Sequence, residues 1–191
     1  MQALIEKILT DAKICPGNII KVGNFLNHQY DTALLREMGA EVARLYDNCG
    51  VTKILTIEAS GIAFAAAAAL EMNVPFVFAK KHASSNIGSD NYTANVHSYT
   101  HNNDYEIIVP KDYLSKDDCV LILDDFLANG AAARGLIEIV EASGAKLAGV
   151  CTQIEKCFQG GGDELRNNGI RVDSLALVES MSDGGITFRQ G

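Results

Sequence analysis

The sequence contains no tryptophan and only 3 prolines, and aromatic residues make up 7% of its 191 residues. It also lacks an excess of positive charge: 16 lysines and arginines face 24 aspartates and glutamates, which gives a net charge of −8. A broad nucleic-acid-binding face needs clustered positive charge, so we expect no nucleic-acid partner. An anionic small molecule remains compatible with this balance, because a local group of amides and lysines can oppose the net charge.

The cysteines are odd in number and scattered, and the sequence lacks a C-x-x-C pair. The five positions are Cys15, Cys49, Cys119, Cys151 and Cys157. This spacing argues against a disulfide framework and against a zinc site. We therefore expect free thiols, mostly small buried side chains, in a reducing compartment.

No apolar run is long enough to cross a membrane. The longest lies between Glu58 and Glu71 and is mostly alanine, far short of the roughly 20 residues that a bilayer requires. The first residues lack the cationic start and apolar core of a secretory signal. We expect a cytoplasmic protein with no membrane partner.

What is present is the balance of a globular domain, with 48% hydrophobic and 21% charged residues. The chain length and the absence of a linker predict one domain over residues 1–191. Apolar residues at helical spacing predict a helix over residues 3–12, and Asp31 is a good N-cap for a second helix.

Two strand–loop–helix–strand units follow. The first consists of a strand at 53–57, a turn at 58–61, a helix at 62–72 and a strand at 76–79. The second has a strand at 119–123, a loop at 124–130, a helix at 131–142 and a strand at 147–154. Repeated βαβ units predict an α/β fold with a central parallel sheet, both loops lying at its carboxyl edge.

Residues 81–104, between these units, are polar, and residues 92–100 partly alternate between apolar and polar side chains. A long polar insertion with a weak hairpin is typical of a lid. An ordinary surface loop is the alternative.

The second unit carries the strongest chemical signal. Asp124 and Asp125 follow a buried strand, and small residues then open the next helix. Carboxylates can accept hydrogen bonds from sugar hydroxyls or approach Mg²⁺, and amides at a helix start bind phosphate. This favours a sugar phosphate. A strand ending in two acids also occurs in receiver domains and Mg²⁺-dependent phosphatases, and an N-cap beside a solvated acid is the plainest alternative.

Two other groups lie at the same predicted edge. The turn at 58–61 offers Ser60 and backbone amides to an anion, unless Gly61 serves only close packing. The adjacent Lys80 and Lys81 can neutralise a pyrophosphate leaving group, unless they form a solvated surface pair. Lys156 ends the last strand of the second unit.

Four segments together resemble the type I phosphoribosyltransferases, and within that family its bacterial xanthine-specific branch. They are Phe25-Leu26-Asn27-His28-Gln29, Ile57-Glu58-Ala59-Ser60-Gly61-Ile62-Ala63, Asp124-Asp125-Phe126-Leu127-Ala128-Asn129-Gly130 and Ile154-Glu155-Lys156. These matches run in order across nearly the whole chain. The resemblance implies a small hood or lid on the sheet, a homodimer, and Mg²⁺-dependent joining of xanthine to the ribose of phosphoribosyl pyrophosphate (PRPP). The products would be xanthosine monophosphate (XMP) and pyrophosphate.

The resemblance also assigns the residues of the site. Asp124 and Asp125 would be the catalytic acids that hold the ribose hydroxyls. The 5′-phosphate would lie on Ala128, Asn129, Gly130, Ala131 and Ala132, the pyrophosphate on Glu58, Ala59, Ser60, Gly61, Lys80 and Lys81, and the purine on Ile20, Asn27 and Lys156. No side chain is assigned as a metal ligand, and the histidines show no metal spacing.

Two positions depart from the wider family. Related 6-oxopurine enzymes often carry an acid where Ala128 stands and a threonine where Asn129 stands, so no general base is evident beside the purine N7. We expect the acidity of xanthine itself to reduce the need for one. A guanine- or hypoxanthine-preferring enzyme, or a PRPP-sensing regulator that binds nucleic acid, are the alternatives. The net charge and the lysines at 80, 81 and 156 disfavour the regulator.

Overall fold

The computed structural model describes residues 1–81, 90–98, 103–182 and 185–189. Its centre is a six-stranded sheet in the order β10-β9-β8-β7-β3-β4. All neighbouring strands pair in parallel except β10, which runs antiparallel to β9. The strands are β3 (Lys53–Ile57), β4 (Phe76–Ala79), β7 (Cys119–Leu127), β8 (Lys146–Lys156), β9 (Val172–Ser182) and β10 (Gly185–Phe188).

Both predicted βαβ units are present. Helix α3 (Gly61–Met72) joins β3 to β4, and α4 (Ala131–Ser143) joins β7 to β8. The strands read as continuous apolar runs because both faces of the sheet are covered. On β7, Leu121 and Leu123 enter one hydrophobic core, while Val120 and Ile122 enter the other.

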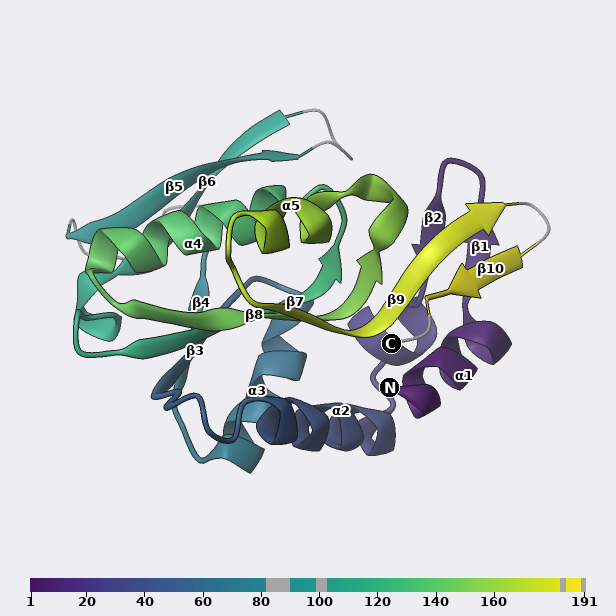
Figure 1. Cartoon of the computed structure of the whole chain (residues 1–191), viewed down its shortest axis with the longest axis horizontal. Coiled ribbons are helices and arrows are strands. Elements are labelled where there is room, and N and C mark those ends of the chain that lie inside the picture. Colours follow the sequence, from purple (N-terminus) through teal and green to yellow (C-terminus); the bar gives the residue numbers. More distant parts are fainter. Residues whose placement is uncertain (82–89, 99–102, 183–184, 190–191) are drawn as a thin grey trace.

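Helices form a layer on each face of the sheet (Figure 1). Helices α1 (Gln2–Asp11), α2 (Thr32–Leu45) and α3 lie on one side, and α4 and α5 (Gly161–Asn167) lie on the other. Asp31 caps α2 as expected, since its side chain accepts a hydrogen bond from the Leu34 amide at 3.2 Å. Gly144 ends α4 in the left-handed conformation, with φ of 74°.

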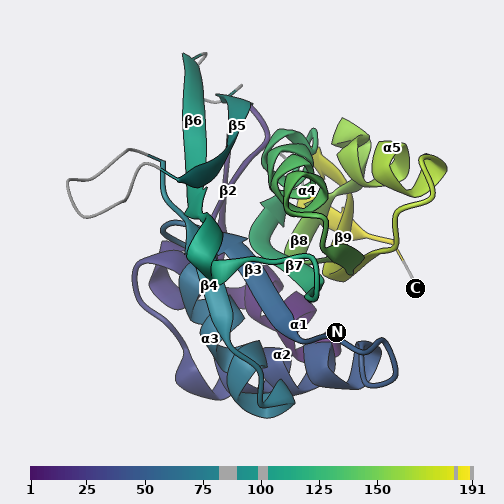
Figure 2. The same ribbon diagram turned by 90° about the vertical axis from the view of Figure 1, so that its left-hand side faces the viewer.

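An antiparallel ribbon of β5 (Asn91–Ser98) and β6 (Asn103–Pro110) packs outside α4 (Figure 2). A Cβ at Gly135 would lie 2.6 Å from Cγ2 of Val96, so the helix and the ribbon approach closely. Of the segment expected to form a lid, 81–104, residues 82–89 and 99–102 lie outside the described residues. The ribbon extends past that segment, because β6 continues to Pro110.

A smaller group of elements covers one end of the sheet. It comprises β1 (Lys13–Cys15), the antiparallel β2 (Ile19–Lys21) and a π-helix, η1 (Gly23–Asn27), which we call the hood. Two 3₁₀ turns, η2 (Lys111–Tyr113) and η3 (Cys157–Gln159), complete the described elements. Within the described part of the chain, no helix is both long and apolar enough to cross a membrane.

Candidate active site

The carboxyl ends of β3, β4, β7 and β8 meet at one edge of the sheet, because these four strands are parallel neighbours. Glu58, Lys80, Asp124 and Lys156 therefore all stand at this edge. The sequence placed each of them at the end of a strand, and the topology brings those ends together. Ligands of open α/β sheets bind at such edges.

The two acids lie within β7 and not in a loop, which corrects the expectation that the strand ends at residue 123. The strand continues to Leu127 because Asp124 pairs with Thr152 and Leu127 with Glu155 on β8. Asp124 Oδ1 accepts a hydrogen bond from the Asp125 amide at 2.9 Å, and Asp125 Oδ1 accepts one from the Phe126 amide at 3.0 Å. Each carboxylate is thus held by the next residue's backbone.

Asp124 is almost completely buried, with 6% of its surface exposed. Burial raises its pKa well above the usual range, and the charge of Asp125 adds to this, while Lys81 acts in the opposite direction. Tyr105 on β6 lies in the same surroundings: burial raises its pKa, with a smaller contribution from Asp124. The Lys81 ammonium sits 5.3 Å from the centre of the Tyr105 ring. The Lys81 ammonium, the Tyr105 ring and the buried Asp124 carboxyl thus lie near one another.

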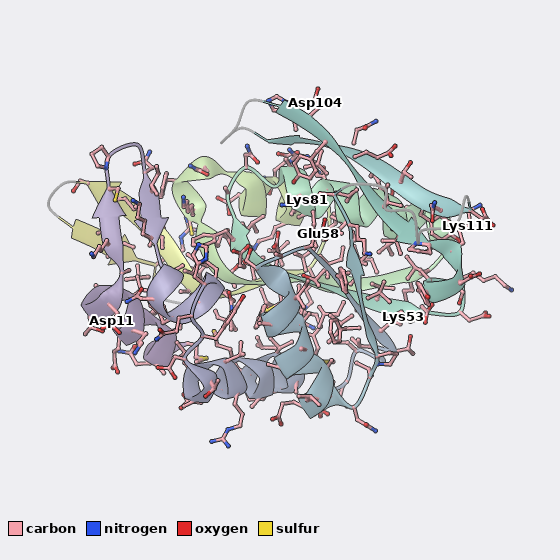
Figure 3. The ribbon with its side chains drawn as sticks, turned by 180° about the vertical axis from the view of Figure 1, so that it is seen from behind. Asp11, Lys53, Glu58, Lys81, Asp104 and Lys111 are labelled. Atoms are coloured by element: carbon pink, nitrogen blue, oxygen red, sulfur yellow. The ribbon has the colours of Figure 1, made fainter. Side chains whose placement is uncertain are left out.

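Loop 58–61 is tied to the lysine pair by its first residue. Glu58 Oε1 accepts a hydrogen bond from the Lys81 amide at 2.7 Å, and the two residues lie close together in the middle of the molecule (Figure 3). Lys80 in turn forms two backbone hydrogen bonds with Ile108 on β6. The Glu58 carboxylate therefore fixes the backbone at the start of the segment that carries the two lysines.

Gly61 stands between the loop and Asp124. A Cβ at this position would lie 2.2 Å from Oγ1 of Thr56 and 3.4 Å from Oδ1 of Asp124. Thr56 is fully buried, and its hydroxyl has no hydrogen-bond partner among the described residues. Only glycine fits this contact without displacing a neighbour. Gly61 therefore has a packing role, and the close contact that requires it is with Thr56.

Loop 128–132 opens α4. Gly130 has φ of 82°, the left-handed conformation that favours glycine, and it turns the chain into the helix. Asn129 Oδ1 accepts a hydrogen bond from the Ala131 amide at 3.1 Å, so this amide already has an acceptor. The next amides, of Ala132 and Ala133, belong to a first turn that has no intrahelical acceptors. Amides in this position at the start of a helix can bind an anion.

Two residues that the sequence did not single out support this loop. Arg134 donates from Nη1 to the Asn129 carbonyl at 2.9 Å. Gly161, the first residue of α5, donates its amide to the Ala128 carbonyl at 3.1 Å. The run of three glycines at 160–162 was the available signal, since such runs mark close approach of one backbone to another.

Lys156 connects the sheet edge to the hood. Its Nζ donates to the Asn18 carbonyl at 2.9 Å and lies 5.6 Å from the centre of the Phe126 ring. Burial lowers the pKa of this lysine. Ile20 on β2 is buried in the adjacent core, and Asn27 ends the π-helix with its side chain partly exposed. The three residues expected to face a purine thus come from the hood and from the strand end that contacts it.

Tyr30 was also missed by sequence reasoning. Its hydroxyl donates to the Ser60 carbonyl at 3.4 Å, which links the segment after the hood to loop 58–61. Its pKa is raised by burial and, to a smaller extent, by the charge of Asp125. An aromatic residue next to a matched motif carries little signal by itself, so only the fold reveals its position.

Among the described residues, no group of three or more His, Cys, Asp or Glu side chains is arranged to hold a metal ion. The two acids at the edge supply oxygen atoms, which Mg²⁺ prefers, but too few to enclose it. Such a donor set fits Mg²⁺ that arrives already coordinated by a phosphorylated substrate.

Comparison with known proteins gives matches over most of the chain. Residues 22–172 match the phosphoribosyl transferase domain family. The xanthine phosphoribosyltransferase of Oceanobacillus iheyensis is 49% identical over 190 residues, covering 100% of this chain and 98% of that protein. The enzyme of the same name from Ruminiclostridium cellulolyticum is 50% identical over 190 residues, with both proteins covered at 100%.

Solved structures share the fold at lower identity. The adenine phosphoribosyltransferase of Giardia lamblia, in complex with 9-deazaadenine, superposes with a TM-score of 0.76 at 22% identity, covering 90% of this chain and 96% of that one. The Trypanosoma brucei adenine phosphoribosyltransferase gives 0.74 at 21% identity, covering 90% and 78%. At this identity the likeness establishes the architecture alone.

Proposed function

The chain belongs to the phosphoribosyltransferase family, and from that membership and the geometry of the sheet edge we propose that it is a xanthine phosphoribosyltransferase. It transfers the 5-phosphoribosyl group of PRPP to xanthine and forms XMP and pyrophosphate, a reaction of purine salvage. The observation that carries the proposal is the sequence identity of 49% and 50%, over the full length of the chain, to two proteins named xanthine phosphoribosyltransferase. The site supports the proposal, because a pair of acids lies between two loops that each precede a helix and can offer backbone amides to an anion.

The residues take their roles from their places at the edge. Asp124 and Asp125 hold the ribose hydroxyls, and residues 128–132 hold the 5′-phosphate. The pyrophosphate lies on residues 59–61 and on the ammonium groups of Lys80 and Lys81. Glu58, also expected to contact pyrophosphate, acts by fixing the Lys81 backbone, because its carboxylate would repel the anion.

The reaction requires positioning and charge stabilisation more than covalent catalysis. The lysines oppose the negative charge that develops on the departing pyrophosphate. The acids hold the ribose while the bond at C1 lengthens and the purine nitrogen attacks from the opposite face. Mg²⁺ bound with PRPP supplies further positive charge at the leaving group.

Xanthine is held at the hood end of the edge. The Lys156 ammonium donates to O6 and N7 of the purine, which favours an oxopurine over adenine, because the adenine amino group is itself a donor. Asn27 donates to the oxygen at C2, the group that distinguishes xanthine from hypoxanthine, and Ile20 provides an apolar contact. The alanine at 128 supplies no base, and the acidity of xanthine compensates.

We further propose one catalytic domain over residues 1–191, with residues 81–104 closing over the site to exclude water. All five cysteines carry free thiols, which fits the reducing cytoplasm.

The enzyme works as a homodimer, as the family resemblance implies. A groove of about 560 Å³ between the end of α3 and the start of β4 offers an apolar contact surface, where Leu70 is 83% exposed.

The proposal is tested by incubating the purified chain with PRPP, Mg²⁺ and xanthine and following both products. We expect XMP and pyrophosphate in equal amounts. Release of pyrophosphate without XMP, or a gel shift of nucleic acid with no turnover, would contradict it.

In a second assay, Lys156→Ala should raise the KM for xanthine and leave the KM for PRPP nearly unchanged. Lys21→Ala, which removes an exposed lysine of the hood, is the matched control.

A further inference from the structure

Helix α5 lies against loop 128–132, and its sequence alone does not explain why it is ordered. It has only 7 residues and starts with Gly161 and Gly162. A helix this short is unstable by itself, and glycine at its start adds conformational entropy to the unfolded chain. Interactions with the rest of the molecule must therefore hold it in place.

A buried ion pair provides that interaction. Glu155, at the end of β8, is completely buried. Its carboxylate accepts hydrogen bonds from Arg166 at 2.8 Å and 2.6 Å, a two-point contact, and from the Ser174 hydroxyl at 2.6 Å. Arg166, in the last turn of α5, also donates from Nε to the Val172 carbonyl at 3.2 Å. The pair thus fastens α5 to both β8 and β9.

The same contact continues through the two glycines to the loop. A Cβ at Gly162 would lie 2.0 Å from Oε1 of Glu155, so the first turn of α5 rests on this carboxylate. A Cβ at Gly161 would lie 2.4 Å from the Gly130 nitrogen and 2.5 Å from the Ala128 carbonyl oxygen. The position of the ion pair therefore sets how closely α5 presses on the loop backbone.

We propose that Glu155 and Arg166 are positioning residues for the 5′-phosphate of the substrate. They hold α5 against loop 128–132 and so fix the direction of its amides. This inference rests on the proposed function, because it takes that loop as the phosphate site. Neither residue contacts the ligand; they act through Gly161 and the Ala128 carbonyl.

The test measures binding without requiring a purine. Ribose 5-phosphate probes loop 128–132, and pyrophosphate with Mg²⁺ probes loop 58–61, both by titration calorimetry. In Arg166→Met we expect the Kd for ribose 5-phosphate to rise by roughly tenfold or more, since small displacements of positioning groups have large effects, while the Kd for pyrophosphate stays within about twofold. Arg166→Lys keeps the positive charge but has one donor nitrogen in place of the two that contact Glu155, and it should give an intermediate value. In turnover, the KM for PRPP should rise and that for xanthine should not.

Arg171→Met is the matched control. Arg171 also has several partners, donating to Asp173 at 2.7 Å and to the Leu45 carbonyl at 2.8 Å, but it precedes the start of β9, at the opposite edge of the sheet. Its loss should lower the melting temperature without changing either Kd.

If Arg166→Met does not fold, Gly161→Ala tests the same contact, because its Cβ must displace the loop. It should weaken ribose 5-phosphate selectively. Equal weakening of both ligands, or no weakening in a folded variant, would overturn the positioning role. A wild-type chain that binds neither compound would instead overturn the proposed function, and with it the assignment of the loop.

Discussion

Asp124 and Asp125 are neighbours in one strand, yet their surroundings differ. Asp124 is buried against Gly61, whereas Asp125 is partly exposed at the edge. Each uses Oδ1 to accept a hydrogen bond from the amide of the following residue. A pair of acids at a strand end was evident from the sequence. Which of the two is buried depends on the packing of α3, which the sequence does not specify.

Asp125→Asn should reduce turnover far more than stability. The asparagine oxygen can still accept the Phe126 amide, so the local backbone is kept, while the charge that holds a ribose hydroxyl is lost. We expect kcat to fall by about 100-fold, the size typical for one electrostatic group in an active site. Steady-state kinetics and thermal unfolding on the same preparation measure both effects. An unchanged rate in a folded variant would remove Asp125 from the mechanism.

Asp124→Asn should stabilise the fold while it lowers activity. Because burial raises the pKa of Asp124, ionising this group costs folding free energy. The cost is absent below the unfolded pKa of about 3.9, grows as the pH rises toward the raised folded pKa, and is constant above it. The melting temperature of the variant relative to the wild type should therefore increase from pH 5 to pH 8. A difference in melting temperature that stays constant or shrinks over this range would show that burial does not disfavour the ionised form of Asp124.

At the scale of elements, the predictable parts were those with a strong apolar pattern. The strands at 53–57 and 119–123 were predicted because burial of both faces of the sheet gives them continuous apolar runs, and the helix after each strand was predicted with it as part of a βαβ unit. The hood was expected only from the family resemblance, and α5, β9 and β10 were not expected. Three-residue strands and a π-helix leave no periodic signal, and the second half of β9 alternates weakly because it pairs with β10 near the surface. The extension of β7 beyond residue 123, through Asp124 and Asp125 to Leu127, was missed because aspartate is depleted in β-strands.

The contact between α3 and β3 can be tested by a double substitution. Gly61→Ala places a Cβ 2.2 Å from the Thr56 hydroxyl, and we expect it to cost about 1–3 kcal/mol of unfolding free energy and to lower activity. Thr56→Ala in the same chain removes the clashing oxygen, whose loss is cheap because it has no partner among the described residues.

The double variant should therefore regain part of both stability and activity relative to Gly61→Ala. Chemical denaturation of the four chains, wild type included, gives the coupling energy between the two positions. Additive effects would mean that Gly61 is required for a reason other than this contact.

At the scale of the whole molecule, the net charge of the chain differs in sign from the charge of the lysines at the proposed site. The chain carries a net charge of −8, yet the site concentrates backbone amides with Lys80, Lys81 and Lys156 at one edge of the sheet. The parallel topology achieves this by bringing four strand ends to the same place. Composition argued only against a broad nucleic-acid face, whereas the fold brings the residues of the proposed anion site to one edge.

The proposed homodimer is tested at the groove beside Leu70. Light scattering after gel filtration should give about twice the chain mass for the wild type. Leu70→Glu should give a smaller species, because it places a charge on an apolar contact surface. Leu9→Glu, on α1 and 57% exposed, is the matched control and should remain a dimer. A monomeric wild type would contradict the homodimer. A Leu70→Glu variant that remains a dimer would show that the interface lies elsewhere.

The most direct test of the account is nucleotide formation from PRPP and Mg²⁺ with xanthine, guanine, hypoxanthine and adenine supplied separately. The placement of Lys156 and Asn27 predicts a kcat/KM for xanthine well above the other three, with adenine lowest because it lacks both oxygens. Comparable or higher values for guanine or hypoxanthine would keep the fold and the chemistry and contradict the assignment of xanthine. Turnover with none of the four bases would contradict the proposed function itself.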